Sequence, residues 1–171
     1  TPNTTYLGIG EISDFDISFP RGDTIIVGYK GPTWNYSSTA PENKVWITYD
    51  KAASWIDITS RFPSFGPFPI FTDKSVSSVI ISPNNSDKIW VSFDGFSTVG
   101  QKLFYSSDGG ATFSDAYSDY LPNSPINCML YQPDSDDGIY IGTDEGVYYK
   151  DNSLSEWTCF NNSFPCNIVT D

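Results

Sequence analysis

Short apolar runs recur along the chain, and each is bounded by residues that favour turns. Three of them, Ile25–Val27, Ile89–Val91 and Ile139–Ile141, are apolar at consecutive positions, as strands are when both of their faces are covered. Each follows an earlier apolar run that ends at a proline and at a turn containing Asp. No stretch of about ten or more residues has amphipathic helical spacing. The pattern predicts an all-β protein.

A tight turn with a distinctive sequence follows one of these strands. The alternating run Leu103–Tyr105 leads into Ser106–Phe113, which reads SSDGGATF. The Asp108 side chain can accept backbone N–H bonds two residues on, and Gly110 supplies positive φ at little steric cost. Phe113 then resumes an extended chain, with its ring free to pack under the turn.

The same pattern occurs twice more. The segment Val45–Trp55 aligns with Leu103–Phe113 without a gap, and Val147–Trp157 is a third copy that lacks the glycines. Thr48 then corresponds to Ser106, Asp50 to Asp108, Trp55 to Phe113, Asn152 to the turn aspartate and Trp157 to the closing aromatic residue. We therefore interpret the pattern as an internal repeat.

The spacing S-x-D-x-G-x-T-F resembles the Asp-box, or BNR repeat, of sialidase-like β-propellers. In that family the box is a structural turn at the periphery of a blade, away from the central channel in which the enzymes do chemistry. The resemblance implies a structural role for Ser106, Asp108, Gly110, Phe113, Thr48, Asp50, Trp55, Asn152 and Trp157.

Each repeat unit reads strand, turn, strand, variable loop, strand, box turn, strand. Four antiparallel strands per unit are typical of a propeller blade. We expect residues 1–171 to be part of one propeller domain with about three blades, at 14–74, 75–125 and 126–165, a blade end at 1–13 and the start of another blade at 166–171. Because propellers have about four to eight blades, this segment is incomplete as a ring. The remainder of the propeller, in the same longer chain or another chain, is the expected partner.

Residues 82–171 have a more specific resemblance. The segments SPNNSDKIWVSFDGF (82–96), LFYSSDGGATF (103–113) and LPNSPINCMLYQPDSDDGIYIGTDEGVYYKDNSLSEWTCFNNSFP (121–165) look like the propeller region of large secreted bacterial proteins exported by the type IX route. The resemblance implies a secreted or cell-surface location.

Charge argues against several partners. The formal net charge is −12, there is no histidine, and Arg21 and Arg61 are the arginines. Such a surface repels phosphate backbones, so nucleic acid is not expected as a partner. No apolar run is long enough to span a bilayer, so membrane insertion is not expected either.

Catalytic chemistry finds little support in the residue types. Without histidine the common nucleophilic triads are excluded, and two arginines cannot form the arginine cluster of a sialidase. Asp94 and Asp144 follow the second strands and are candidates for an acid and base pair, but no motif surrounds them. The acidic loop Asp134–Gly138 favours a solvated turn over a calcium site. We expect no catalytic residue, metal or cofactor.

Two loops carry aromatic residues that can contact a ligand. Trp34 and Tyr36, and Phe65 and Phe68, lie among Gly and Pro, where their faces could stack on sugar rings or anchor a protein. The alternative is that they cap the core at the blade edges. Cys159 and Cys166 flank a short turn, and a local disulfide and two free thiols both stay open.

The sequence supports two functions. The first is a non-catalytic propeller segment of a secreted or cell-surface bacterial protein, serving as scaffold or as adhesion module for glycan or protein. The alternative is part of a propeller glycoside hydrolase whose catalytic residues are completed outside this segment.

Overall fold

The computed structural model describes residues 11–31, 43–63, 74–96, 101–161 and 168–170. These residues form three sheets of four antiparallel strands, and within each sheet the strands follow chain order. Sheet A contains β1 (Glu11–Ile17), β2 (Ile25–Lys30), β3 (Lys44–Thr48) and β4 (Ile56–Asp57), followed by the 3-10 helix η1 (Thr59–Arg61). Sheet B contains β5 (Val76–Ile81), β6 (Ile89–Phe93), β7 (Leu103–Ser106) and β8 (Ser114–Asp115). Sheet C contains β9 (Ile126–Tyr131), β10 (Ile139–Thr143), β11 (Gly146–Lys150) and β12 (Thr158–Cys159).

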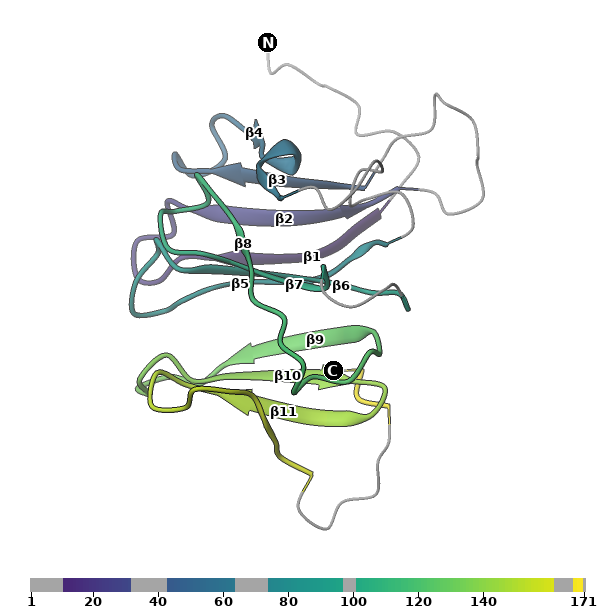
Figure 1. The fold of residues 1–171 in the computed structure, drawn as a ribbon. Coiled ribbons are helices and arrows are strands. Elements are labelled where there is room, and N and C mark those ends of the chain that lie inside the picture. The colour runs from purple at the N-terminus through teal and green to yellow at the C-terminus, as the bar shows by residue number, and fades with distance from the viewer. Residues whose placement is uncertain (1–10, 32–42, 64–73, 97–100, 162–167, 171) are drawn as a thin grey trace.

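The predicted fold class is confirmed: the chain is all-β and repeats a four-stranded antiparallel unit three times. Sheets A and C lie on opposite sides of sheet B (Figure 1). Strand β5 contacts both β1 and β9, so the first strands of the three sheets lie side by side. No helix in the described part of the chain is long and apolar enough to cross a bilayer.

Strand boundaries differ from the sequence expectation at the start. Strand β1 begins at Glu11, inside the segment 1–13 that was expected to belong to an earlier unit. The three consecutive apolar runs lie in β2, β6 and β10, each the second strand of its sheet. This placement explains their composition, because a second strand has a neighbour on each side and a sheet against at least one face.

Sheets A and B share an apolar core. Ile26 and Ile47 of sheet A pack with Val91 and Phe104 of sheet B, and all four are fully buried. Phe62, which follows η1, reaches across from the sheet A side and enters an aromatic cluster of sheet B. Its ring stacks on Phe113 at 4.2 Å and meets the edges of Phe93 and Phe104.

The first strands approach one another very closely. Asp14 and Asp16 of β1 accept backbone N–H bonds from Val79 (2.9 Å) and Ile81 (2.7 Å) of β5. A methyl group on Gly28 would lie only 2.5 Å from Cγ1 of Val76. Glycine at this position is therefore what lets β5 pack against the sheet.

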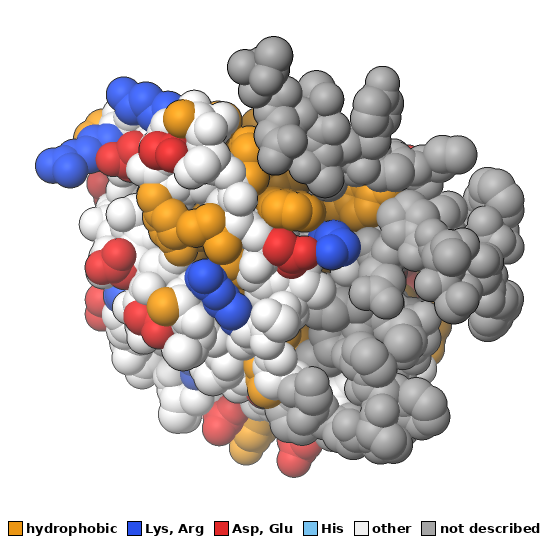
Figure 2. Space-filling view, turned by 90° about the horizontal axis from the view of Figure 1, so that it is seen from above, with side chains coloured by type: hydrophobic (Ala, Val, Ile, Leu, Met, Phe, Trp, Pro, Cys, Tyr) orange, Lys and Arg blue, Asp and Glu red, His pale blue; other side chains and the backbone are white. Residues whose placement is uncertain are grey.

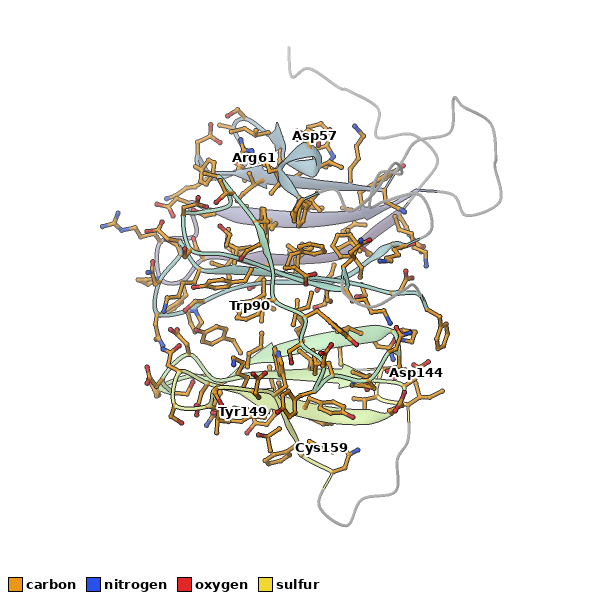
Figure 3. All side chains as sticks on the ribbon, viewed as in Figure 1. Asp57, Arg61, Trp90, Asp144, Tyr149 and Cys159 are labelled. Carbon is orange, nitrogen blue, oxygen red and sulfur yellow. The ribbon has the colours of Figure 1, made fainter. Side chains whose placement is uncertain are left out.

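The core between sheets B and C has a different composition. Leu103 packs with Met129, Ile139 and Ile141, and Trp157 closes one side. Trp90 and Tyr148 lie against this cluster without being fully buried. Figure 3 shows Trp90 between the two sheets. This seam thus combines aliphatic contacts with amphipathic aromatic side chains.

Candidate functional site

The turn between β7 and β8 is held by its own side chains. The Ser106 hydroxyl donates to Oδ1 of Asp108 (2.7 Å) and accepts the N–H of Gly110 (2.8 Å). Asp108 accepts the N–H and the hydroxyl of Thr112, at 2.9 and 2.6 Å, so the N–H lies four residues on, not two as expected. These bonds to Thr112 and Ser106 lower the pKa of Asp108 to about 2. Gly110 has φ of 83°.

The turn between β3 and β4 has the same bonding. Thr48 donates to Asp50 (2.7 Å), and Asp50 accepts the N–H and hydroxyl of Ser54, which lower its pKa to about 2. Lys51 and Ala52 take positive φ without glycine. Trp55, however, is 40% exposed, whereas Phe113 at the matching position is buried. Phe113 is covered by Phe62 of the neighbouring sheet, and no described sheet covers Trp55.

The third turn departs from the expected alignment. Asn152 does not take the place of the turn carboxylate; its side-chain amide instead donates to Asp136 and Asp137. Asp151 accepts the N–H bonds of Ser153 (2.9 Å) and Leu154 (3.2 Å). In the first two turns the hydroxyl of Ser106 or Thr48 donates to the turn carboxylate. The third turn has Lys150 at this position, so that hydroxyl is missing.

At the seam between sheets A and B, side chains of one sheet fasten the turn of the next. The Tyr49 hydroxyl donates to the carbonyl of Gly109 (2.6 Å), and Nη1 of Arg61 donates to the carbonyl of Gly110 (2.8 Å). Figure 3 shows Arg61 beside this turn. No such bond from sheet B to the backbone of the third turn occurs among the residues the structure describes.

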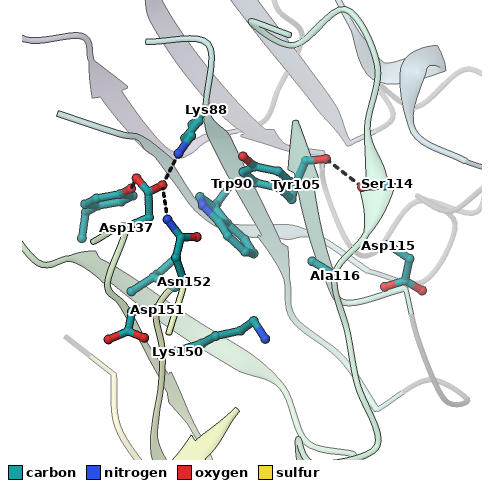
Figure 4. Close-up of a pocket in the computed structure, with 12 residues that line it drawn as sticks. Lys88, Trp90, Tyr105, Ser114, Asp115, Ala116, Asp137, Lys150, Asp151 and Asn152 are labelled. Carbon is teal, nitrogen blue, oxygen red and sulfur yellow. Dashed lines mark hydrogen bonds and ion pairs between the residues drawn. The ribbon is translucent and has the colours of Figure 1, made fainter. Parts of the chain in front are cut away.

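A pocket of about 320 Å³ occupies the corresponding place between sheets B and C. One wall is the cross-strand row Trp90, Tyr105 and Ser114 of sheet B, with Ala116 beside it. The opposite wall is the row Tyr131, Ile139 and Lys150 of sheet C. The remaining lining residues are Lys88, Asp115, Asp137, Asp151 and Asn152 (Figure 4).

An ion pair crosses the seam at the rim of this pocket. Lys88 of sheet B binds Asp137 of sheet C, which also accepts bonds from the Tyr131 hydroxyl and the Asn152 amide. Burial raises the pKa of Asp137, but the bonds from Lys88, Tyr131 and Asn152 outweigh it and leave the pKa lowered. The pKa of Lys88 is raised by the bond to Asp137. Both groups are therefore charged at neutral pH.

The aromatic wall keeps unused hydrogen-bonding capacity. The rings of Trp90 and Tyr105 lie 4.7 Å apart at 45°. Among the described residues, neither the indole N–H of Trp90 nor the hydroxyl of Tyr105 has a hydrogen-bond partner. Across the pocket, Nζ of Lys150 donates to the carbonyls of Leu154 and Ser155, so one of its three donors is left.

Solved structures with the same arrangement identify the fold. A GH74 enzyme of Niastella koreensis matches with a TM-score of 0.57 and 17% identity over 86% of this chain and 22% of its own. A GH74 xyloglucanase from Xanthomonas campestris gives 0.55 and 10% identity over 86% of this chain and 30% of its own. YCF48 bound to D1 peptide gives 0.53 and 14% identity, over 88% of this chain and 40% of its own. The three sheets are blades of a β-propeller.

The propeller segment spans well under half the length of each of these structures. No protein-family model matches the sequence, and no curated protein matches it. At these identities the likeness shows the fold alone.

The acidic candidates have structural partners in the propeller. Asp94 accepts the N–H of Ser75 (2.6 Å), and Asp144 accepts the side-chain amide of Asn127 (2.8 Å). Figure 3 places Asp144 at the end of sheet C opposite Tyr149. No group of three metal-ligating side chains occurs in the described ranges.

Five other predicted residues lie outside the described part of the chain. Trp34, Tyr36, Phe65 and Phe68 lie outside the described residues, as does Cys166. Cys159 is exposed on β12, and because Cys166 lies outside the described residues, a disulfide and two free thiols both stay open.

The pocket itself was missed by sequence reasoning, although a signal exists in the repeat. Ile26 and Ile47 of sheet A correspond by strand register to Trp90 and Tyr105 of sheet B. Lys150 likewise corresponds to Ser106. Comparing the same positions across the repeat would have marked a seam where aliphatic residues give way to aromatic and charged ones.

Proposed function

We propose that this chain is a non-catalytic part of a larger β-propeller with Asp-box turns, and that it acts as a scaffold or binding module for glycan or protein. We further propose a secreted or cell-surface bacterial protein as its context. The bonding around Asp50 and Asp108 supports the box assignment, because both carboxylates are used within their turns. The location rests on the resemblance of residues 82–171 to secreted propeller proteins.

The observation that carries the proposal is the exposure of large apolar side chains on the outer faces of sheets A and C. On the outer face of sheet A, Phe15 is 58% exposed, and on the outer face of sheet C, Leu130 is 66% exposed. Figure 2 looks onto the side of sheet A and shows hydrophobic side chains at the surface. Propeller blades bury such faces by packing on neighbouring blades.

The C-terminal residues point to the same partner. A methyl group on Gly142 would lie 2.7 Å from Cγ1 of Val169. Gly28 has the same close approach to Val76, the first residue of β5. Val169 also donates its N–H to the carbonyl of Thr143 (3.1 Å). Residues 168–170 therefore sit on sheet C as the first residues of a further blade would, which supports the remainder of the propeller as partner.

A glycan array probed with the parent protein, set beside turnover assays on polysaccharides, tests this function. We expect retention on glycan or protein ligands and no release of sugar. Hydrolysis that is abolished by Asp144→Asn would overturn the non-catalytic assignment. Detection of the protein on intact cells or in culture supernatant tests the proposed location.

The alternative is a part of a propeller glycoside hydrolase. The likeness to GH74 structures favours it. The internal bonding of Asp94 and Asp144 weighs against it, because both carboxylates already serve as structural acceptors. The YCF48 structure contains a bound peptide, which supports the binding class.

A further inference from the structure

We infer that the pocket between sheets B and C binds one uncharged sugar ring. This inference rests on the proposed binding function and names its ligand class and its site.

The first support is the way the repeat changes at this seam. At the seam between sheets A and B, the row Ile26 and Ile47 is fully buried and its side chains carry no hydrogen-bonding group. At the next seam the same positions hold Trp90 and Tyr105, each partly exposed and facing the pocket. Neither of these two ring polar atoms is a buried atom without a partner, so both are open to solvent, where a ligand hydroxyl can replace water.

The second support is the chemistry of the two walls. Trp90 and Tyr105 offer apolar ring faces together with an N–H and a hydroxyl, which suits the C–H face and the hydroxyl edge of a sugar. The opposite wall offers the remaining donor of Lys150 and the amide oxygen of Asn152. The Asp151 carboxylate also lines the pocket, but Tyr149 and its own turn already use both of its oxygens. Figure 4 shows these groups around the open space below Trp90.

The charge and the volume of the pocket define the class of ligand further. Two lysines face three aspartates in the lining, and Lys88 is neutralised by Asp137. The lining therefore keeps an excess of one negative charge, which disfavours a phosphate, and its aromatic faces and neutral polar groups favour an uncharged ligand. The volume of 320 Å³ lies at the lower end of the range for ligand pockets, about 300–1,000 Å³, and suits one ring more than an extended chain.

The test uses a panel of methyl glycosides of glucose, galactose, mannose and xylose, and the corresponding disaccharides. Binding is followed by saturation-transfer NMR and by the shift of the Trp90 indole N–H signal, assigned with Trp90→Phe. We expect a dissociation constant on the order of 1 mM for at least one methyl glycoside. If a disaccharide binds as tightly as its methyl glycoside, the natural ligand is the end of a sugar chain. If the methyl glycoside binds more tightly than the disaccharide, the natural ligand is a single sugar.

Two variants test the site. Ala116→Leu fills the pocket and should weaken binding by about tenfold or more, while Ala111→Leu, in an exposed turn, should leave it unchanged. Tyr105→Phe keeps the ring and removes one hydrogen bond, which should weaken binding about fivefold. Tyr120→Phe, at an exposed tyrosine, is its control.

The inference is overturned if no glycoside shifts the Trp90 indole N–H signal at a concentration about ten times the expected dissociation constant. It is also overturned if Tyr105→Phe and Ala116→Leu bind as the wild type does, or if N-acetyl-lysine amide binds where every glycoside fails. Glycan retention on the array that survives both variants would leave the proposed function standing and place its site elsewhere. Loss of array binding in both variants would support the pocket.

Discussion

The Phe62 side chain provides the sharpest test of how the blades are held together. Phe62 follows η1 on the sheet A side, yet its ring lies among Phe93, Phe104 and Phe113 of sheet B. Only 5% of its surface is exposed. Phe62→Ala would therefore leave a cavity between two sheets instead of within one.

The size of the effect follows from that burial. Replacing a buried Phe by Ala costs about 3–5 kcal/mol, the sum of lost transfer free energy and the cavity left behind. For a chain of this length each kcal/mol lowers the Tm by about 2–4 °C, so we expect a drop of about 6–20 °C. The stacked contact with Phe113 should contribute about 0.5–1.5 kcal/mol as coupling energy in a double-mutant cycle of Phe62→Leu and Phe113→Leu.

Urea denaturation followed by tryptophan fluorescence measures the free energy of unfolding, with the m-value as a check that the unfolded state is unchanged. Phe96→Ala is the matched control, because Phe96 is 75% exposed, and it should change the free energy of unfolding by less than about 0.5 kcal/mol. If Phe62→Ala costs no more than this control, the ring does not join the two sheets and the packing described above is wrong.

Three further predictions concern the turns and the seams. Because the pKa values of Asp50 and Asp108 are lowered to about 2 in the folded protein, their stabilisation is present above the ordinary value of 3.8 and is lost as the pH falls towards 2. The Tm of the wild type should thus fall between pH 4 and pH 2, and the Tm of Asp108→Asn should fall less steeply over the same range. Parallel curves of Tm against pH for the two proteins would refute this. Gly28→Val should destabilise by about 1–3 kcal/mol or more through overlap with Val76, seen in thermal melts, whereas an unchanged Tm would show that β5 can move away. Arg61→Lys should lower the Tm through loss of the bond to the carbonyl of Gly110, with Arg21→Lys as the exposed control; equal melting of the two variants would contradict that role.

The sequence by itself determined the repeating unit. Proline, Asp and Gly at fixed offsets specify turns through local backbone chemistry, and consecutive apolar residues mark strands covered on both faces. Ser106 and Asp108 need only residues within their own turn to form their bonds. Such short-range interactions can be predicted from the order of residues, and so the four-stranded unit could be predicted too.

Tertiary structure decided what each copy of the unit touches. Trp55 and Phe113 occupy the same place in the repeat, but one is exposed and the other buried, because only Phe113 has Phe62 against it. The pocket likewise depends on which rows of sheets B and C face each other, and those rows join residues far apart in the chain. Side-chain burial and unused donors at a seam are properties of two sheets together, so they could be known only once the sheets were in place.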